Sequence, residues 1–68
     1  MDPNAALAYL ERHPATSIND ASEDTKEHAF ALHQWIGRGG FAPDWTKYPS
    51  GTKTYRALTG FLNPRDMK

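Results

Sequence analysis

The fold depends on one short stretch in the middle of the chain, Gly37-Arg38-Gly39-Gly40-Phe41-Ala42-Pro43. Three glycines in four positions predict the end of a helix, because glycine alone takes the left-handed backbone conformation freely. We expect Gly40 to be that left-handed residue and Phe41 to fold back against Ile36. The chain should therefore reverse its direction at residues 37–40.

The segment before this stretch has the pattern of a long helix, from about residue 21 or 23 to about residue 38. Two N-terminal caps compete for it: Asp20 followed by Glu23, or Ser22 opening the acidic run that begins at Glu23. At helical spacing, one side carries most of the apolar positions and the two edges carry aromatic rings. The side consists of Ala29, Leu32, His33 and Ile36, and the edges are Phe30 and Trp35. This band is wide enough to pack on two neighbours.

The chain opens with the signals of a shorter helix over its first dozen residues. Asp2 can cap the first turn, and Pro3 suits the first helical position because its missing N–H has no partner there. Leu7 and Leu10, with Ala6 beside them, form the stripe that we expect to be buried. An isolated helix of about a dozen residues is marginal in water, so this one must dock on the rest of the chain.

Downstream of the glycines, residues 41–49 are aromatic but interrupted by proline, and we expect an ordered loop whose rings return to the long helix. A last helix of about nine residues is predicted next, capped by Ser50 or Thr52 and ended by Gly60. Three side chains would share one face of it, namely Tyr55, Leu58 and Leu62. An extended segment is the alternative, because threonine and tyrosine favour strands, but it would have no strand to pair with.

Together these elements predict an all-α fold, a small bundle of two to three short helices with an ordered aromatic glycine- and proline-containing loop after the central helix. The whole chain, residues 1–68, would form a single small helical domain, with residues 63–68 as a frayed tail. A chain of this length buries only about 60% of the surface that it exposes when unfolded, so its core must be small.

The composition of the 68 residues excludes several classes of protein. Without cysteine, the chain has no disulfide framework, no thiolate zinc site and no nucleophilic thiol. No apolar run approaches the roughly 18 residues of a membrane span, and no phosphate-loop or dinucleotide glycine pattern is present. We therefore expect a cytoplasmic protein that has no membrane contact and no cofactor.

Three histidines raise the question of a metal site, but their spacing argues against one. His28 and His33 are five residues apart, about 140° around a helix, so they cannot chelate one ion as an i, i+4 pair does. Ser17, Ser22 and Ser50 lie at loop or cap positions, and none lies in a glycine-flanked nucleophile elbow. We expect no metal, no catalytic residue and no enzyme activity, also because so small a domain has little room for a closed pocket.

Four aromatic residues gather within fourteen positions around the glycine stretch: Trp35, Phe41, Trp45 and Tyr48. One interpretation is a miniature aromatic core in a chain with few aliphatic residues. The other is that part of the cluster, above all Trp35 and Trp45, stays exposed and anchors a partner protein together with Arg38, since tryptophan, tyrosine and arginine dominate binding hot spots. We favour a non-enzymatic protein–protein interaction module. A homodimer is a further possibility, because two copies could shelter rings that one small core cannot.

The formal net charge is zero, but the two halves of the chain differ in charge. Residues 1–36 hold six acidic and two basic residues, a balance of −4, whereas residues 37–68 hold six basic and two acidic residues, a balance of +4. This pattern favours docking of the two halves on each other or, as the alternative function, nucleic-acid binding by the basic half. The candidate phosphate contacts are Arg38, Lys47, Lys53 and Arg56.

The same region carries a signature that also extends, more loosely, to the opening Met1-Asp2-Pro3-Asn4-Ala5: Leu32-His33-Gln34-Trp35-Ile36-Gly37-Arg38-Gly39-Gly40-Phe41-Ala42-Pro43-Asp44-Trp45. It resembles the pattern of tryptophan, aliphatic residue, two variable residues, Gly-Gly-Phe, one further residue, proline and a nearby tryptophan in short proteins of actinobacterial phages and mobile elements. Ala42 stands where a larger aliphatic residue is usual, and the basic extension from Thr52 to Lys68 has no counterpart. The resemblance implies a helical phage-type accessory protein, acting on a host or phage protein in the bacterial cytoplasm. It implies no particular mechanism.

Overall fold

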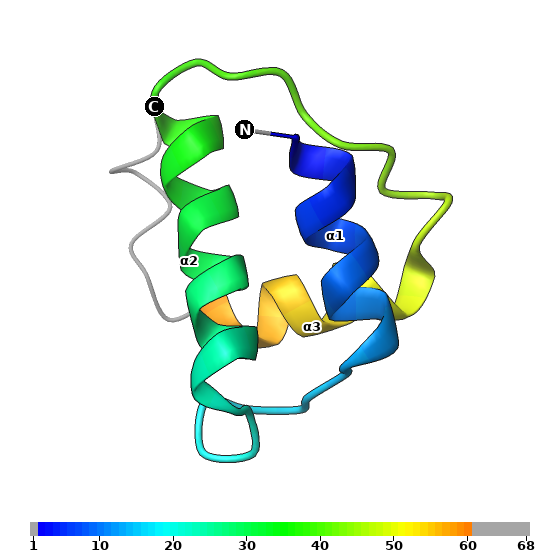
Figure 1. Cartoon of the computed structure of the whole chain (residues 1–68), viewed down its shortest axis with the longest axis vertical. Helices are drawn as coiled ribbons and strands as arrows, with labels where there is room; N and C mark the ends of the chain where they lie inside the picture. Colours follow the sequence, from blue (N-terminus) through cyan, green and yellow to red (C-terminus); the bar gives the residue numbers. More distant parts are fainter. Residues whose placement is uncertain (1, 61–68) are drawn as a thin grey trace.

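The computed structural model describes residues 2–60, and this part of the chain forms three helices joined by two loops (Figure 1). The helices are α1 (Pro3–Arg12), α2 (Glu23–Gly37) and α3 (Pro49–Thr59). α1 and α2 run antiparallel to each other, and α3 lies across them near the end where α1 finishes and α2 begins (Figure 1). The described residues contain no strand, which confirms the all-α bundle and the helical interpretation of the last element.

α1 begins as the sequence predicts. The Asp2 carboxylate accepts hydrogen bonds from the backbone N–H groups of Asn4 at 3.0 Å and Ala5 at 3.3 Å. Pro3 takes the first helical position, where its missing N–H costs nothing. The helix ends at Arg12, which places a positive charge in the last turn, where the helix dipole favours it.

α2 uses the second of the two predicted caps, the one formed by Ser22. The Ser22 hydroxyl oxygen accepts a hydrogen bond from the Thr25 N–H at 3.2 Å. Glu23 and Asp24 then place negative charge in the first turn, next to the positive end of the helix dipole. The helix continues to Gly37, one residue before the expected end.

α2 ends in a Schellman motif whose left-handed residue is Gly39, so the prediction of Gly40 for that position is wrong. Gly39 has a φ of 91°, its N–H donates to the Ile36 carbonyl at 3.0 Å, and the Gly40 N–H donates to the Trp35 carbonyl at 2.9 Å. Gly40 is required for another reason, because a Cβ atom there would collide with the indole ring of Trp35. The chain reversal itself is confirmed, displaced by one residue.

α3 begins earlier than the sequence predicts, and its N-terminal residues supply no side-chain cap. Its N-cap residue is Tyr48 and its first residue is Pro49, so neither Ser50 nor Thr52 caps it. We expected Pro49 in the loop, but proline also suits the first helical position. Gly60 is the C-cap residue and ends the helix as predicted.

α1 supplies the cap that α3 lacks. Oε1 of Glu11 accepts a hydrogen bond from the Gly51 N–H at 2.6 Å, which places a carboxylate at the positive end of α3. The two helices approach closely because Gly51 has no side chain. A Cβ atom at residue 51 would lie 2.6 Å from the Leu7 carbonyl oxygen and 3.0 Å from the Glu11 nitrogen. This contact fixes the point at which α1 crosses α3.

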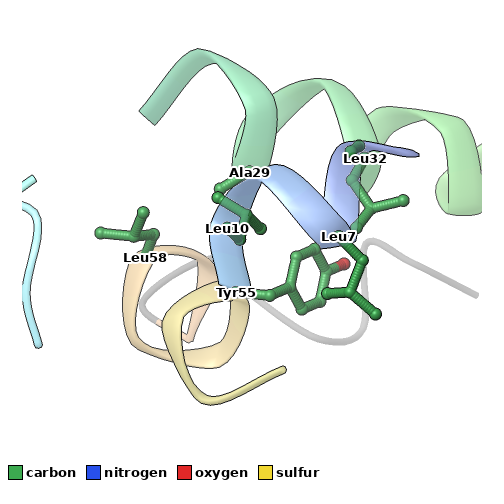
Figure 2. Packing of buried hydrophobic residues seen from close by; sticks show 7 residues of the cluster. Leu7, Leu10, Ala29, Leu32, Tyr55 and Leu58 are labelled. Carbon is green, nitrogen blue, oxygen red and sulfur yellow. The ribbon is translucent and has the colours of Figure 1, made fainter. Parts of the chain in front are cut away.

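The core lies where the three helices meet (Figure 2). Its buried residues are Ala6, Leu7, Leu10, Ala29, Leu32, Tyr55 and Leu58. The sequence predicted all seven, whereas Ile36, expected on the same face of α2, is only half-buried. The buried Thr54 hydroxyl oxygen accepts a hydrogen bond from the Ala15 N–H at 3.1 Å, which joins the loop after α1 to α3.

Leu62 and the predicted tail, residues 63–68, lie outside the described residues.

Candidate protein-interaction surface

The loop between α2 and α3 positions most of the predicted interaction residues. It leaves the C-terminal end of α2, passes the N-terminal end of α1 and descends on the far side of α1 to reach α3 (Figure 1). The Asp44 N–H donates to Oδ1 of Asn4 at 2.8 Å, and the Thr52 hydroxyl donates to the Trp45 carbonyl at 2.9 Å. The loop is ordered, as predicted. Only its start, at Phe41, is held by α2 as we expected, and the rest of the loop is held by α1 and α3.

Trp35 and Phe41 form an aromatic pair at the C-terminal end of α2. Their rings meet edge to face, with centroids 5.7 Å apart and planes at 87°. The Trp35 Nε1–H also donates to the Phe41 carbonyl at 2.9 Å, so the indole holds the backbone of residue 41 as well as its ring. We expected Phe41 to pack on Ile36, but the ring contact that forms is with Trp35. Phe41 stays 62% exposed.

Trp45 and Tyr48, at the other end of the loop, pack against the core. Both are half-buried, and the Trp45 ring contacts Tyr55 of α3 with centroids 5.1 Å apart and planes at 43°. Nζ of Lys47 lies 5.7 Å from the centroid of the Tyr48 ring. These two rings therefore follow the core interpretation, because the loop carries them across α1 to α3. Trp35 is half-buried and packs against the core as well, so of the four aromatic residues only Phe41 is exposed.

Arg38 is the C-cap residue of α2 and is exposed. With Ala31, Gln34 and Trp35 it lines an open hollow of ≈ 290 Å³ on α2. Three of the five predicted partner-binding residues thus lie together, namely Trp35, Arg38 and Phe41. Sequence reasoning missed Ala31 and Gln34, although their helical spacing from Arg38 places them on its side of the helix.

The four basic residues of the alternative interpretation are divided between two parts of the molecule. Lys53 and Arg56 are exposed and three residues apart on α3, so they share one side of that helix. Lys47 is exposed in the turn that precedes α3. Arg38 follows the C-terminal end of α2, which is roughly 22 Å long, and α3 lies nearer to the opposite end (Figure 1).

Asp44 organises the turn that leads into α3. Its Oδ1 accepts hydrogen bonds from the Thr46 hydroxyl at 2.7 Å, the Thr46 N–H at 3.2 Å and the Lys47 N–H at 3.3 Å. The hydrogen bond from the Thr46 side chain is the main cause that lowers the pKa of Asp44 below its usual 3.8. This carboxylate is stabilised in its charged form by the turn that it holds.

A stack of rings that the sequence did not predict joins α1 to α2. Tyr9 stacks on His13 with centroids 4.3 Å apart and on His28 with centroids 3.8 Å apart. Nδ1 of His28 donates to the Asp24 carbonyl at 2.7 Å. The i, i+4 spacing of Tyr9 and His13 is visible in the sequence, but the contact with His28 depends on how the helices pack.

Across residues 2–60, no three histidine or carboxylate side chains are grouped to hold a metal ion.

Two buried polar atoms have no hydrogen-bond partner within the described part of the chain, Nδ1 of His33 and the hydroxyl of Tyr55. His33 is half-buried on the apolar side of α2, where the sequence places it. Burial raises the pKa of the Tyr55 phenol above its usual 10.0. Both groups belong to the packing of α2 and α3, and neither lies in the hollow that Arg38 lines.

Comparisons with protein-family models, curated proteins and solved structures find no match to this chain. The resemblance to short phage proteins therefore stays a prediction that depends on the motif between Trp35 and Trp45. Within residues 2–60, no helix is both long enough and apolar enough to cross a bilayer.

Proposed function

We propose that this protein is a non-enzymatic interaction module that binds a partner protein through the C-terminal end of α2. Phe41 is the observation that carries the proposal. Its ring is 62% exposed and is nevertheless held by its edge-to-face contact with Trp35 and by the indole hydrogen bond to its carbonyl. An aromatic side chain that is already fixed loses little conformational freedom on binding, so more of its contact energy appears as affinity.

Trp35, Arg38 and Phe41 together form the aromatic platform of this proposal. Phe41 would enter an apolar pocket of the partner, and Arg38, exposed in the hollow that it lines with Trp35, would donate to a carboxylate or carbonyl at the rim. The Schellman motif fixes the backbone conformation between Arg38 and Phe41. If the phage-type resemblance holds, the partner is a host or phage protein in the bacterial cytoplasm.

The test is a capture experiment with matched variants. Immobilised wild type, Phe41→Ser and Lys53→Ser are exposed to the same lysate, and a binder recovered by the wild type is purified so that its Kd for each protein can be measured by calorimetry. We expect Lys53→Ser to bind as the wild type does and Phe41→Ser to bind at least roughly 30-fold more weakly, the loss expected for a hot spot. A binder whose Kd changes less than about twofold in Phe41→Ser contradicts the proposal, and so does the recovery of none.

Nucleic-acid binding is the second candidate, and one observation favours it. Lys47, Lys53 and Arg56 are exposed near or on α3, and none of them forms an ion pair with another described residue. Each phosphate contact should contribute a slope of about −0.9 to the dependence of log K on log salt. An electrophoretic shift at about 50 mM salt that disappears in the double variant Lys53→Glu, Arg56→Glu would support this candidate, and the lack of a shift would exclude it.

A further inference from the structure

A groove runs along the side of α2 that points away from the core. A hollow of ≈ 440 Å³ is lined by Glu23, Lys26, Glu27, Phe30, Ala31 and Gln34. The hollow beside Arg38 shares Ala31 and Gln34 with it, so the two form one surface along the helix. Glu23, Glu27, Gln34 and Arg38 are all exposed, and their spacing places them opposite the buried Ala29 and Leu32.

Charge is ordered along this groove. Two carboxylates, Glu23 and Glu27, lie at its N-terminal end together with the ammonium group of Lys26, so that end carries a net charge of −1, and the guanidinium of Arg38 lies at its C-terminal end. A surface with acid at one end and base at the other is complementary to a copy of itself that runs in the opposite direction.

We propose that the groove pairs with the same groove of a second copy, with the two α2 helices antiparallel about a twofold axis between residues 30 and 31. This register sets Glu23 opposite Arg38 of the second copy and Glu27 opposite Gln34 of the second copy, and symmetry repeats each pair. Phe30 and Ala31 flank the axis, so the large ring of Phe30 lies opposite the small side chain of Ala31 of the second copy. Trp35 and Arg38 line the groove and also belong to the aromatic platform, whereas Phe41 does not line it. The inference goes beyond the proposed function because its occupant is a second copy of this chain, and the two are tested at different residues.

Glu23 and Arg38 are both accessible to a second copy. Oε1 of Glu23 lies 2.8 Å from Nζ of Lys26, but the Glu23 side chain is 90% exposed, so its second oxygen can accept from a guanidinium. Arg38 forms no ion pair with another residue of the described chain. Exposed ion pairs are individually weak, so the dimer should be weak as well, with a Kd on the order of 10 μM.

Sedimentation over a dilution series tests the proposal with the full chain. Arg38→Glu sets like charges opposite each other at both ends of the interface, and we expect it to raise the dimer Kd by about tenfold to a hundredfold. The charge exchange Glu23→Arg, Arg38→Glu should restore the Kd to within about threefold of wild type. Lys53→Glu makes the same change of charge on α3 and should leave the Kd unchanged.

Strictly monomeric protein at about 1 mM overturns the proposal and leaves the groove to another occupant, such as an unrelated protein or the chain's own residues 61–68. A dimer whose Kd is the same in wild type and Arg38→Glu overturns it as well. Circular dichroism of each variant shows that the fold is intact. Neither outcome changes the capture experiment, because that experiment depends on Phe41.

Discussion

Gly37 and Gly39 are two residues apart, yet a methyl group should have opposite effects at the two positions. Gly39 has a φ of 91°, which costs a residue with a side chain about 1–2 kcal/mol. Gly37 is helical, and a Cβ atom there meets nothing within 4 Å. We expect Gly39→Ala to lower the free energy of unfolding by about 1 kcal/mol and Gly37→Ala to raise it by about 0.5 kcal/mol. Urea titrations of the two variants check this. Equal changes in the free energy of unfolding would contradict the left-handed conformation of Gly39 at the end of α2.

The phenol of Tyr55 should make the free energy of unfolding fall at alkaline pH. Because burial raises the pKa of its phenol, the protonated form is favoured in the folded state, and this contribution is fully present below pH 10.0. It is lost as the pH rises through the folded-state pKa. Tyr55→Phe should cost little near neutral pH, since the hydroxyl has no hydrogen-bond partner within residues 2–60.

We therefore expect the urea midpoint of the wild type to fall more steeply than that of Tyr55→Phe as the pH rises above about pH 10. Tyr48→Phe is the control for the removal of a phenol that is only half-buried. Parallel curves for wild type and Tyr55→Phe would contradict the burial of this hydroxyl.

Among the elements, α3 is the one whose stability depends most directly on another helix. Glu11→Ala removes the carboxylate that caps it and should cost about 1 kcal/mol, whereas Glu11→Gln keeps an acceptor oxygen and should cost less. Gly51→Ala forces a Cβ atom against the backbone of α1 and should cost about 1–3 kcal/mol. Ser50→Ala, at an exposed neighbouring position, is the control. Thermal unfolding followed by circular dichroism measures all four, and a neutral Gly51→Ala would refute the close crossing.

The same contact explains why the sequence predicted the cap of α1, offered the cap of α2 as one of two candidates, and missed the cap of α3. Asp2 and Ser22 each lie next to the helix that they cap, so local sequence contains the signal. The cap of α3 comes from Glu11, forty residues before Gly51, and no local pattern reveals it. The position of the left-handed glycine failed for a different reason, because adjacent glycines can adopt that conformation equally well.

In the molecule as a whole, removal of a large apolar side chain should have very different effects in the core and on the aromatic platform. Leu58 is fully buried and its truncation to alanine should cost about 2–5 kcal/mol. A domain of this size has a total stability of roughly 3–10 kcal/mol, so Leu58→Ala should be close to unfolding. Phe41→Ala removes an exposed ring and should cost less than about 1.5 kcal/mol. Melting curves of both variants check this, and a large loss in Phe41→Ala would assign Phe41 to the fold.

The path of the loop between α2 and α3 limits how much of the candidate surface the sequence can predict. The sequence identified the aromatic residues, and the turn at residues 37–40 correctly placed Phe41 beside α2. The separation of Trp45 from Phe41 depends on the hydrogen bond between Asn4 and Asp44, two residues that are forty positions apart. Only the packed bundle shows which rings join the core and which ring stays in water.

Three hydrogen bonds join residues about forty positions apart: Asn4 with Asp44, Glu11 with Gly51, and Ala15 with Thr54. During synthesis on the ribosome, none of them can form until the second of its residues has left the exit tunnel. The apolar stripes of α1 and α2 therefore remain incompletely covered until α3 has been made, and until then the nascent chain is exposed to chaperones and proteases. A product that stops before residue 51 would lack α3 and its share of the core, and we expect the cell to degrade it.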